Sequence, residues 1–227
     1  MPDISQSQRL LSYLMEIPLE TISSAVHPNL YVSLQQGRLQ LSTDKAIYSF
    51  SDLYTNFRRA FRQIRLEDIQ STDALLLGLG LGSIPEMLEK KFRKPFHYTA
   101  VELDEAIIYL AQKYTLSNLQ ASFDIYCIDA GEYVTSCPDA RFGFICVDLF
   151  IDDEIPNQFT TPDFFTQLHR ILQEDGLLLF NCFSLEATDR RKAQTVFEEL
   201  FLPQFPDATY IDTGTNWILV NRKNILR

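Results

Sequence analysis

A glycine-rich turn and a carboxylate that follows it are the first residues in this chain whose types and spacing suggest chemistry. The turn carries three glycines at alternate positions, Gly78, Gly80 and Gly82, directly after an apolar run. Glycine lets the backbone turn sharply and approach a ligand that a Cβ atom would keep away. Glu102 ends a second apolar run, at the place where a βαβ unit holds the two hydroxyls of a ribose. Together these features predict a nucleoside-binding site, whereas the glycines alone would indicate only a tight turn.

Asp148 stands at the end of a further apolar run that is typical of a central strand. An acid at the carboxyl end of such a strand lies beside the crevice in which open α/β sheets bind ligands. Asp148 is therefore a candidate functional residue, with a structural capping role as the alternative. The long loop that follows contains Asp152 and Asp153. It has the length of a lid, although solvated surface acids would show the same composition.

The elements that position these residues alternate between strand and helix from residue 73 onward. Strands are expected at 74–79, 97–102, 123–128, 142–148 and 176–183, and helices near 83–93, 104–115, 130–136, 162–173 and 188–202. Such alternation is typical of a parallel sheet covered by helices on both faces. Two further runs, 208–212 and 215–220, flank a glycine turn and predict an antiparallel hairpin. The expected fold is α/β, with a seven-stranded Rossmann-like sheet whose last strand runs antiparallel.

The N-terminal part predicts a smaller unit made of helices and a β-hairpin. Its expected elements are a helix at 5–16, strands at 30–34, 38–42 and 46–50, and a helix from about residue 52 to 64. Ser51 or Asp52 would cap this last helix. We expect residues 1–68 to form an appendage of the main domain, residues 69–227, because so small a sheet is not stable alone.

The composition excludes several classes of partner. A net charge of −10 opposes nucleic-acid binding, which needs a concentrated basic face. The best candidate face, Arg58, Arg59, Arg62 and Arg65, is typical of a solvated helix surface. The chain has no apolar run long enough for a transmembrane helix, and its first residues do not resemble a signal peptide. The negative charge fits a small-molecule or cationic substrate better. Four cysteines without C-x-x-C spacing are expected to be free thiols, which fits a cytoplasmic protein.

No metal site is predicted from the histidines. His27, His97 and His169 are isolated in the sequence, without ligand spacing to a cysteine or to another histidine. We therefore expect them to have ordinary packing or surface roles. The N-terminal hairpin and helix would offer a surface for a homodimer.

The glycine spacing distinguishes between two nucleotide-binding folds. The dinucleotide fingerprint places its third glycine where this chain has Ser83. Over about residues 70–222 the chain instead resembles the class I S-adenosylmethionine-dependent methyltransferases. The resemblance implies that the glycine turn passes under the methionine part of the ligand, and that Glu102 holds the ribose. It also implies that the adenine is contacted by Leu103, Asp129 and the backbone of Ala130. Asp129 would in addition cap the helix that follows it.

A closer resemblance covers nearly all of the chain after residue 28. The segments 34–42, 44–48 and 160–165 are similar to the hairpin, the tyrosine-containing strand and the helix entry of the spermidine synthases, the polyamine aminopropyltransferases. The resemblance implies that Gln40 touches the nucleoside ligand and that Tyr48 lines the acceptor pocket. It also implies that Asp148 takes a proton from the attacking amine.

Departures from this family's motifs leave three functions open. Leu81 stands where the family has the aspartate that binds the amino end of decarboxylated S-adenosylmethionine, and an apolar side chain cannot pair with an ammonium. The first hypothesis is therefore methyl transfer from S-adenosylmethionine to a small molecule. The second is aminopropyl transfer from decarboxylated S-adenosylmethionine to an amine, with Asp152 or Asp153 supplying a missing carboxylate. The third is a non-catalytic nucleoside-binding protein or partner subunit.

Overall fold

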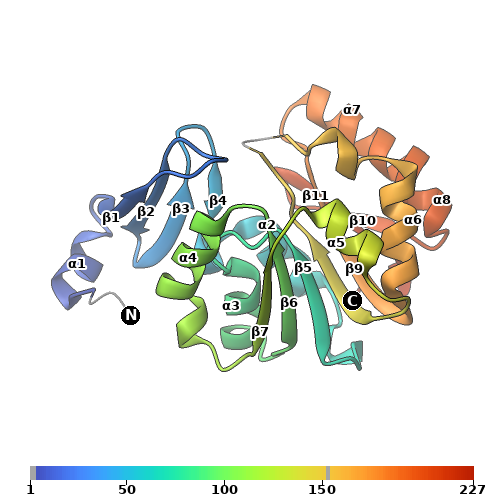
Figure 1. The fold of residues 1–227 in the computed structure, drawn as a ribbon, viewed down its shortest axis with the longest axis horizontal. Helices are drawn as coiled ribbons and strands as arrows, with labels where there is room; N and C mark the ends of the chain where they lie inside the picture. Colours follow the sequence, from blue (N-terminus) through green and yellow to red (C-terminus); the bar gives the residue numbers. More distant parts are fainter. Residues whose placement is uncertain (1–3, 152–153) are drawn as a thin grey trace.

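The computed structural model describes residues 4–151 and 154–227. Its strands form two sheets, one of seven strands with helices on both faces and one of four antiparallel strands near the N-terminus (Figure 1). This confirms the expected α/β architecture. Among the described residues, no helix is both long enough and apolar enough to cross a membrane.

The large sheet has the strand order β10-β11-β9-β8-β5-β6-β7. Its strands are β5 (Asp73–Leu77), β6 (His97–Glu102), β7 (Phe123–Cys127), β8 (Phe142–Val147), β9 (Leu172–Phe183), β10 (Thr209–Asp212) and β11 (Asn216–Val220). The five strands from β5 to β9 are parallel, while β11 runs antiparallel to β9 and β10 antiparallel to β11. Leu77 is in register with Val101 on β6 and with Val147 on β8. The residues that follow these three strands therefore meet at one edge.

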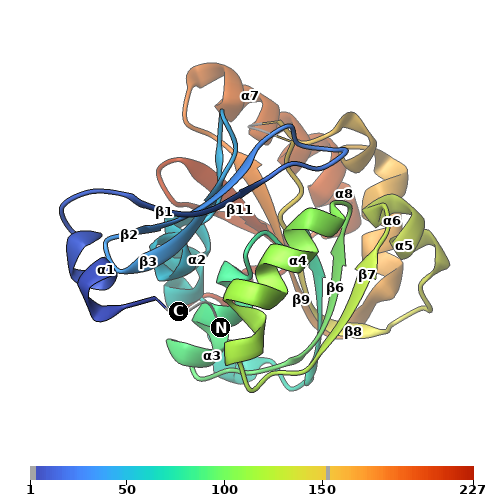
Figure 2. The same ribbon diagram turned by 60° about the vertical axis from the view of Figure 1, so that its left-hand side comes forward.

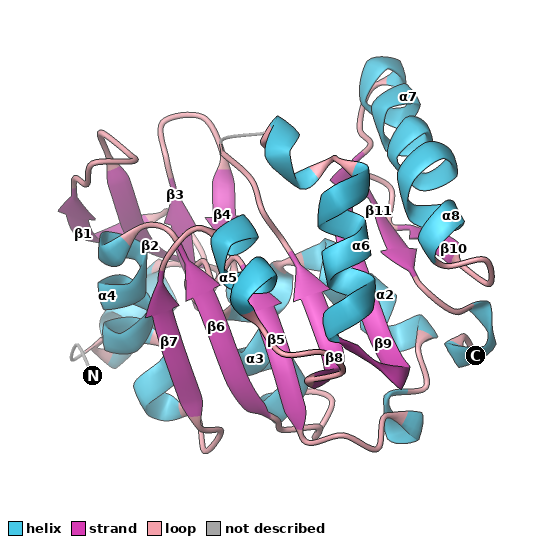
Figure 3. Cartoon of the chain, turned by 45° about the vertical axis from the view of Figure 1, so that its right-hand side comes forward, coloured by secondary structure: helices cyan, strands magenta, loops and turns pink. Residues whose placement is uncertain are grey.

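Helices cover both faces of this sheet because its strands are apolar on both sides. The helices are α2 (Thr55–Gln63), α3 (Ser83–Lys90), α4 (Glu105–Tyr114), α5 (Ala130–Ser136), α6 (Pro162–Ile171), α7 (Ala187–Thr195) and α8 (Leu202–Gln204), with a π-helical segment (Val196–Phe201) between the last two. Within β5, Ala74 and Leu76 pack toward α2 and α3, whereas Leu75 and Leu77 pack toward α5 and α6. Figure 3 shows α5 and α6 in front of the strands and α2 and α3 behind them.

The small sheet contains one strand more than the sequence predicted. It comprises β1 (Ile17–Ile22), β2 (Leu30–Gln35), β3 (Arg38–Ser42) and β4 (Ile47–Ser49), and α1 (Gln6–Leu11) precedes it. β1 carries Pro18 and lacks a clear alternation of polar and apolar residues, which hides it in the sequence. It pairs only with β2 at the edge of the sheet, a position that tolerates proline.

One face of the small sheet packs on the main domain above the glycine turn (Figure 2). The apolar cluster joins Leu30, Val32 and Leu41 of the small sheet to Leu81 and to α4. The small sheet thereby forms one wall of the crevice at the carboxyl ends of the parallel strands.

The prediction that Ser51 or Asp52 caps a helix was wrong. Ser51–Leu53 form a 3-10 turn, and α2 begins only at Thr55, with Tyr54 in the N-cap position. The Asp52 carboxylate instead forms ion pairs with Arg38 on β3 and with Lys91 at the end of α3. Asp52 therefore links the small sheet to the main domain.

Candidate active site

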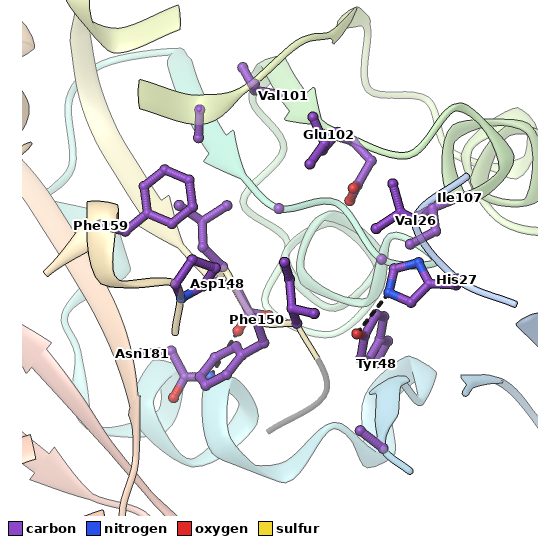
Figure 4. A pocket seen from close by; sticks show the side chains of 18 of the residues that line it. Val26, His27, Tyr48, Val101, Glu102, Ile107, Asp148, Phe150, Phe159 and Asn181 are labelled. Carbon is purple, nitrogen blue, oxygen red and sulfur yellow. Dashed lines mark hydrogen bonds between the residues drawn. The ribbon is translucent and has the colours of Figure 1, made fainter. Parts of the chain in front are cut away.

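A cavity of about 760 Å³ lies between the small sheet and the carboxyl ends of the parallel strands. Figure 4 shows Asp148 and Asn181 on one side of it, His27 and Tyr48 on the opposite side, and Glu102 between the two. Most of the residues singled out in the sequence thus line one pocket, although they come from both sheets.

The glycine turn after β5 is packed tightly against its neighbours. Gly78 has a φ of +88°, and a Cβ atom there would lie 2.2 Å from the backbone oxygen of Asp148. Gly80, with a φ of +51°, would place a Cβ atom 3.1 Å from the backbone oxygen of Tyr48. Both glycines line the pocket, whereas Gly82, with a φ of +85°, is the N-cap of α3. The turn therefore needs glycine both for its backbone conformation and for space.

Glu102 is fixed in the pocket wall at the end of β6. One carboxylate oxygen accepts a hydrogen bond from the backbone N–H of Leu79, 3.0 Å away, and the other accepts one from that of Asp104, 3.2 Å away. Burial raises the pKa of Glu102, and these backbone donors partly oppose that rise. A carboxylate held in this way can accept hydrogen bonds from vicinal hydroxyls without reorganising.

Asp129 performs the capping role that the sequence predicted. Its Oδ1 accepts from the backbone N–H groups of Gly131 at 2.8 Å and Glu132 at 3.2 Å, at the start of α5. Its Oδ2 accepts a hydrogen bond from the side chain of Gln158, 2.8 Å away. Asp129, Ala130 and Leu103 all line the pocket. Their contact with an adenine stays a prediction.

Asp148 lies in the pocket with a hydrogen-bond donor on each of its carboxylate oxygens. Asn181 donates to Oδ1 at 2.8 Å, and the Tyr54 hydroxyl donates to Oδ2 at 2.9 Å. Asn181 in turn accepts a hydrogen bond from Asn216, so β9 and β11 hold its orientation. Burial raises the pKa of Asp148 to about 6, and the charge of Glu102 adds to the rise, while both donors oppose it. A carboxylate with that pKa can accept a proton near neutral pH.

Tyr48 lines the pocket, as the sequence resemblance implied, but its neighbour His27 was not predicted to be there. His27 and the Tyr48 hydroxyl are 2.9 Å apart, and the other ring nitrogen of His27 lies 2.9 Å from the carboxylate of Asp104. The sequence suggested that His27 is isolated, but the structure places it in contact with two polar side chains. A span of 77 positions separates His27 from Asp104, and no local pattern connects them.

Gln40 and Leu81, both singled out in the sequence, do not line the pocket. Gln40 is buried on β3, and its contact with the ligand stays a prediction. Leu81 is 2% exposed and packs in the cluster between the small sheet and α4, so its side chain does not face the pocket. Asp152 and Asp153 lie outside the described residues. No group of three or more metal-binding side chains occurs within 4–151 and 154–227.

Comparison with known families gives a match over the large sheet. The family model described as "Spermine/spermidine synthase domain" matches residues 73–220. The chain belongs to the spermine/spermidine synthase family. The match begins at β5 and ends with β11, so it covers the whole large sheet.

Individual relatives in the spermine/spermidine synthase family are distant. The chain is 26% identical over 137 residues to a polyamine aminopropyltransferase of Vibrio vulnificus. The aligned stretch covers 58% of this chain and 46% of that protein. It is 29% identical over 111 residues to a probable polyamine aminopropyl transferase of Bifidobacterium longum. Here the aligned stretch covers 49% of this chain and 24% of that protein. The chain thus spans less than half the length of either relative. A probable spermidine synthase from Corynebacterium glutamicum has the same fold, with a TM-score of 0.68 at 19% identity over 89% of this chain and 78% of that one.

Proposed function

We propose that this protein transfers an aminopropyl group from decarboxylated S-adenosylmethionine to a small amine. The observation that carries the proposal is the Asp148 carboxyl, which lies in the pocket beside the glycine turn with a pKa of about 6. Membership of the spermine/spermidine synthase family supports it, because this family uses decarboxylated S-adenosylmethionine as a substrate. Methyl transfer, which the sequence departures favoured, becomes the second candidate.

Several residues of the pocket support binding of the nucleoside part of such a substrate. The glycine turn leaves a cradle that a Cβ atom at Gly80 would narrow, and Glu102 is fixed with its carboxylate in the pocket wall. Asp129 and the backbone of Ala130 line the same wall at the end of β7. These contacts would orient the sulfonium toward the side of the pocket that holds Asp148.

Asp148 would act on the attacking amine. A protonated amine has no lone pair, so the carboxylate first pairs with the ammonium and then accepts its proton as the nitrogen becomes nucleophilic. The nitrogen forms a bond to the propyl carbon next to sulfur, and the electrons of the breaking carbon–sulfur bond stay on the sulfur. The protein's main contribution to such a displacement is alignment of nucleophile and leaving group. Asn181 and Tyr54 keep Asp148 in one orientation for this step.

One observation supports methyl transfer as the second candidate. The glycine turn has Leu81 where the spermidine synthases have an aspartate, and its side chain packs in the apolar cluster. The turn therefore lacks the carboxylate that would bind the ammonium end of decarboxylated S-adenosylmethionine and so select this form over S-adenosylmethionine. S-adenosylmethionine carries its transferable methyl group on the corresponding sulfonium sulfur, so the same pocket could hold it.

The product of turnover separates these functions. We would incubate the protein with putrescine and either decarboxylated S-adenosylmethionine or S-adenosylmethionine, and identify the nucleoside product by mass spectrometry. We expect 5′-methylthioadenosine together with spermidine, and we expect Asp148→Asn to abolish both while the exposed control Asp175→Asn does not. S-adenosylhomocysteine with a methylated acceptor would establish methyl transfer instead. Tight nucleoside binding without any product would favour a non-catalytic protein.

A further inference from the structure

We propose that a second cavity, at the opposite end of the parallel strands from Asp148, binds a small organic phosphate. This cavity has a volume of about 450 Å³ and is enclosed by the end of α2, the residues that follow it, the residues that follow α3, and Arg227. Within residues 4–151 and 154–227, it shares no lining residue with the candidate active site. This second site does not depend on the reaction assigned above.

The cavity lies at the amino ends of the parallel strands. Its lining residues come from the stretch 61–67, which leads into β5, and from 92–94, which leads into β6. The candidate active site lies at the carboxyl ends of the same strands. Phe61 of α2 and Phe92, which follows α3, bring the two segments together, with ring centroids 5.5 Å apart. The cavity is thus formed by tertiary packing rather than by one local motif.

Positive charge is concentrated around this cavity. Among the described residues its lining contains one acid, Glu67, against four cations, Arg62, Arg93, Lys94 and Arg227. Glu67 pairs with Arg227 at 2.9 Å, which leaves the lining with a net charge of +3. The whole chain has the opposite balance, with 30 acids against 20 Lys and Arg. A local excess of cations in an acidic protein favours an anionic ligand.

Arg62 brings to the cavity a guanidinium that the fold itself does not use. The sequence places it among four arginines, and the other three, Arg58, Arg59 and Arg65, donate hydrogen bonds to backbone carbonyls. For Arg62, the described part of the chain supplies no hydrogen bond or ion pair. A guanidinium is a planar fork of donors that matches two oxygens of one phosphate. Arg62 is therefore available to such a ligand.

Arg93 has an unusual backbone conformation for its residue type. Its φ is +54°, in the left-handed region where glycine is common after a helix. The turn lets the backbone N–H of Lys94 donate to the carbonyl of Leu88 at 2.8 Å, just beyond α3. Glycine would form this turn with less strain, so what arginine adds is its side chain. No described residue forms a hydrogen bond or ion pair with that side chain.

The remaining walls of the cavity are apolar. Phe61 and Leu66 are buried, and Phe92 is partly buried beside them. A cavity of this volume falls in the range of small-molecule sites, about 300–1,000 Å³, so a bare phosphate ion would leave most of it empty. The ligand that fits both the cations and these walls is an anion joined to an apolar group.

The net charge of the lining favours a phosphate over a carboxylate. A phosphate monoester carries about −1.5 to −2 at pH 7, whereas a carboxylate carries a single charge. The phosphate also has three oxygens, enough for both guanidinium forks. Lys94 adds a fixed positive charge, because its ammonium donates to the carbonyl of Ile69. A phosphate ester with an apolar group is therefore the class of ligand that this site suits.

The first test is calorimetric titration of the full chain with phenyl phosphate, which joins a phosphate to an apolar ring. We expect one saturable site with an affinity about 10-fold higher than for inorganic phosphate, which lacks the ring, or for benzoate, which lacks the second charge. Absence of saturable binding would overturn the proposal. So would an equal affinity for inorganic phosphate or for benzoate, because the apolar walls or the extra cations would then contribute nothing.

Two substitutions locate the binding in this cavity. Arg62→Gln and Arg93→Gly should each weaken the binding of phenyl phosphate by about 10-fold, through loss of hydrogen bonds to a charged group. Arg93→Gly should fold, because glycine adopts the left-handed conformation readily. Arg191→Gln, a change of an exposed arginine on α7, is the matched control and should keep the wild-type affinity. Unchanged affinity in either cavity variant would overturn the proposal.

Nitrogen-15 NMR of the arginine side chains separates ligand binding from a purely structural role. The structural alternative is that these cations only stabilise the carboxyl ends of α2 and α3 through the helix dipoles. We expect the Nε signals of Arg62 and Arg93, identified by their loss in the two variants, to shift on saturation with phenyl phosphate, while that of Arg191 does not. Signals that stay in place would overturn the proposal, even if both variants were less stable than the wild type.

Discussion

A Cβ atom on Gly78 would lie 2.2 Å from the backbone oxygen of Asp148, so the glycine turn and the candidate base are in direct contact. The contact follows from the register of the sheet. The backbone N–H of Asp148 donates to the carbonyl of Leu77 at 2.8 Å, and that of Gly78 donates to the carbonyl of Val101 at 2.9 Å. The turn that would hold the nucleoside thus also determines where Asp148 lies.

Gly78→Ala should destabilise the protein and displace Asp148. The added methyl group meets backbone rather than a flexible side chain, and the φ of +88° strains any L-residue. We expect a loss of about 3 kcal/mol in the free energy of unfolding, from overpacking and backbone strain together. Urea denaturation would measure it. Gly214→Ala is the matched control, because its φ of +96° imposes similar strain while its nearest contact is the side chain of Arg59. Equal losses in the two variants would contradict the role of the Asp148 contact.

Asp148→Asn should abolish transfer but leave nucleoside binding intact. Loss of a general base commonly lowers the rate by about 10²- to 10⁴-fold. In the wild type, kcat/KM should fall as the pH decreases through about 6, because the protonated carboxyl can no longer accept a proton. A pH–rate profile measures this fall, and calorimetric titration with 5′-methylthioadenosine checks that binding persists. Wild-type turnover that stays constant from pH 5 to pH 8 would show that Asp148 is not the base.

The same substitution should make the protein more stable at neutral pH. The folded-state pKa of Asp148 is about 6, above its usual value of 3.8, so the folded state favours the protonated form. This contribution is fully present below about pH 4 and is lost as the pH rises through about 6. Asp148→Asn should therefore gain about 1–3 kcal/mol over the wild type at pH 8 and little at pH 4. Thermal unfolding at both pH values would test the difference, and a gain that is larger at pH 4 would contradict the sign.

Tyr54→Phe should move the pH dependence of activity upward. The Tyr54 hydroxyl donates to Asp148 and lowers its pKa, so its removal raises the pKa of Asp148 further. Burial and the nearby Asp148 charge raise the pKa of Tyr54 itself, which keeps it protonated and able to donate. The loss of one hydrogen bond to a charged group should shift the acidic limb of kcat/KM by about one pH unit. Tyr210→Phe, a change at an exposed position on β10, should leave the limb in place. A downward shift in Tyr54→Phe would refute the assignment.

Glu102→Gln should weaken nucleoside binding without unfolding the turn. An amide oxygen can still accept from the backbone of Leu79, but the group loses its charge and one acceptor. We expect the Kd of 5′-methylthioadenosine to rise by about 10- to 100-fold, equivalent to roughly 1.4–2.8 kcal/mol. Glu105→Gln, an exposed change three residues away on α4, is the control. An unchanged Kd in Glu102→Gln would remove Glu102 from the ribose site.

Local sequence patterns determined the fold and one half of the site. Strand length, helical spacing and glycine turns are properties of contiguous residues, so the seven-stranded sheet and its antiparallel end could be predicted. Glu102 and Asp148 were predicted for the same reason, because each ends an apolar run and parallel strands end at a common edge, whereas Asp129 was predicted from the family resemblance. Edge strand β1 was missed, because edge position relaxes the pattern that identifies a strand.

Only the tertiary structure decided which side chains meet in the pocket. Asp148 receives Tyr54 from 94 positions away, and Asp104 receives His27 from 77 positions away. The direction of Leu81, which packs into the cluster rather than into the pocket, was likewise decided by the docking of the small sheet on α4. Contacts of this kind depend on how whole elements pack against one another. The residues within either segment carry no local signal for them, whereas the fold brings them within hydrogen-bond distance.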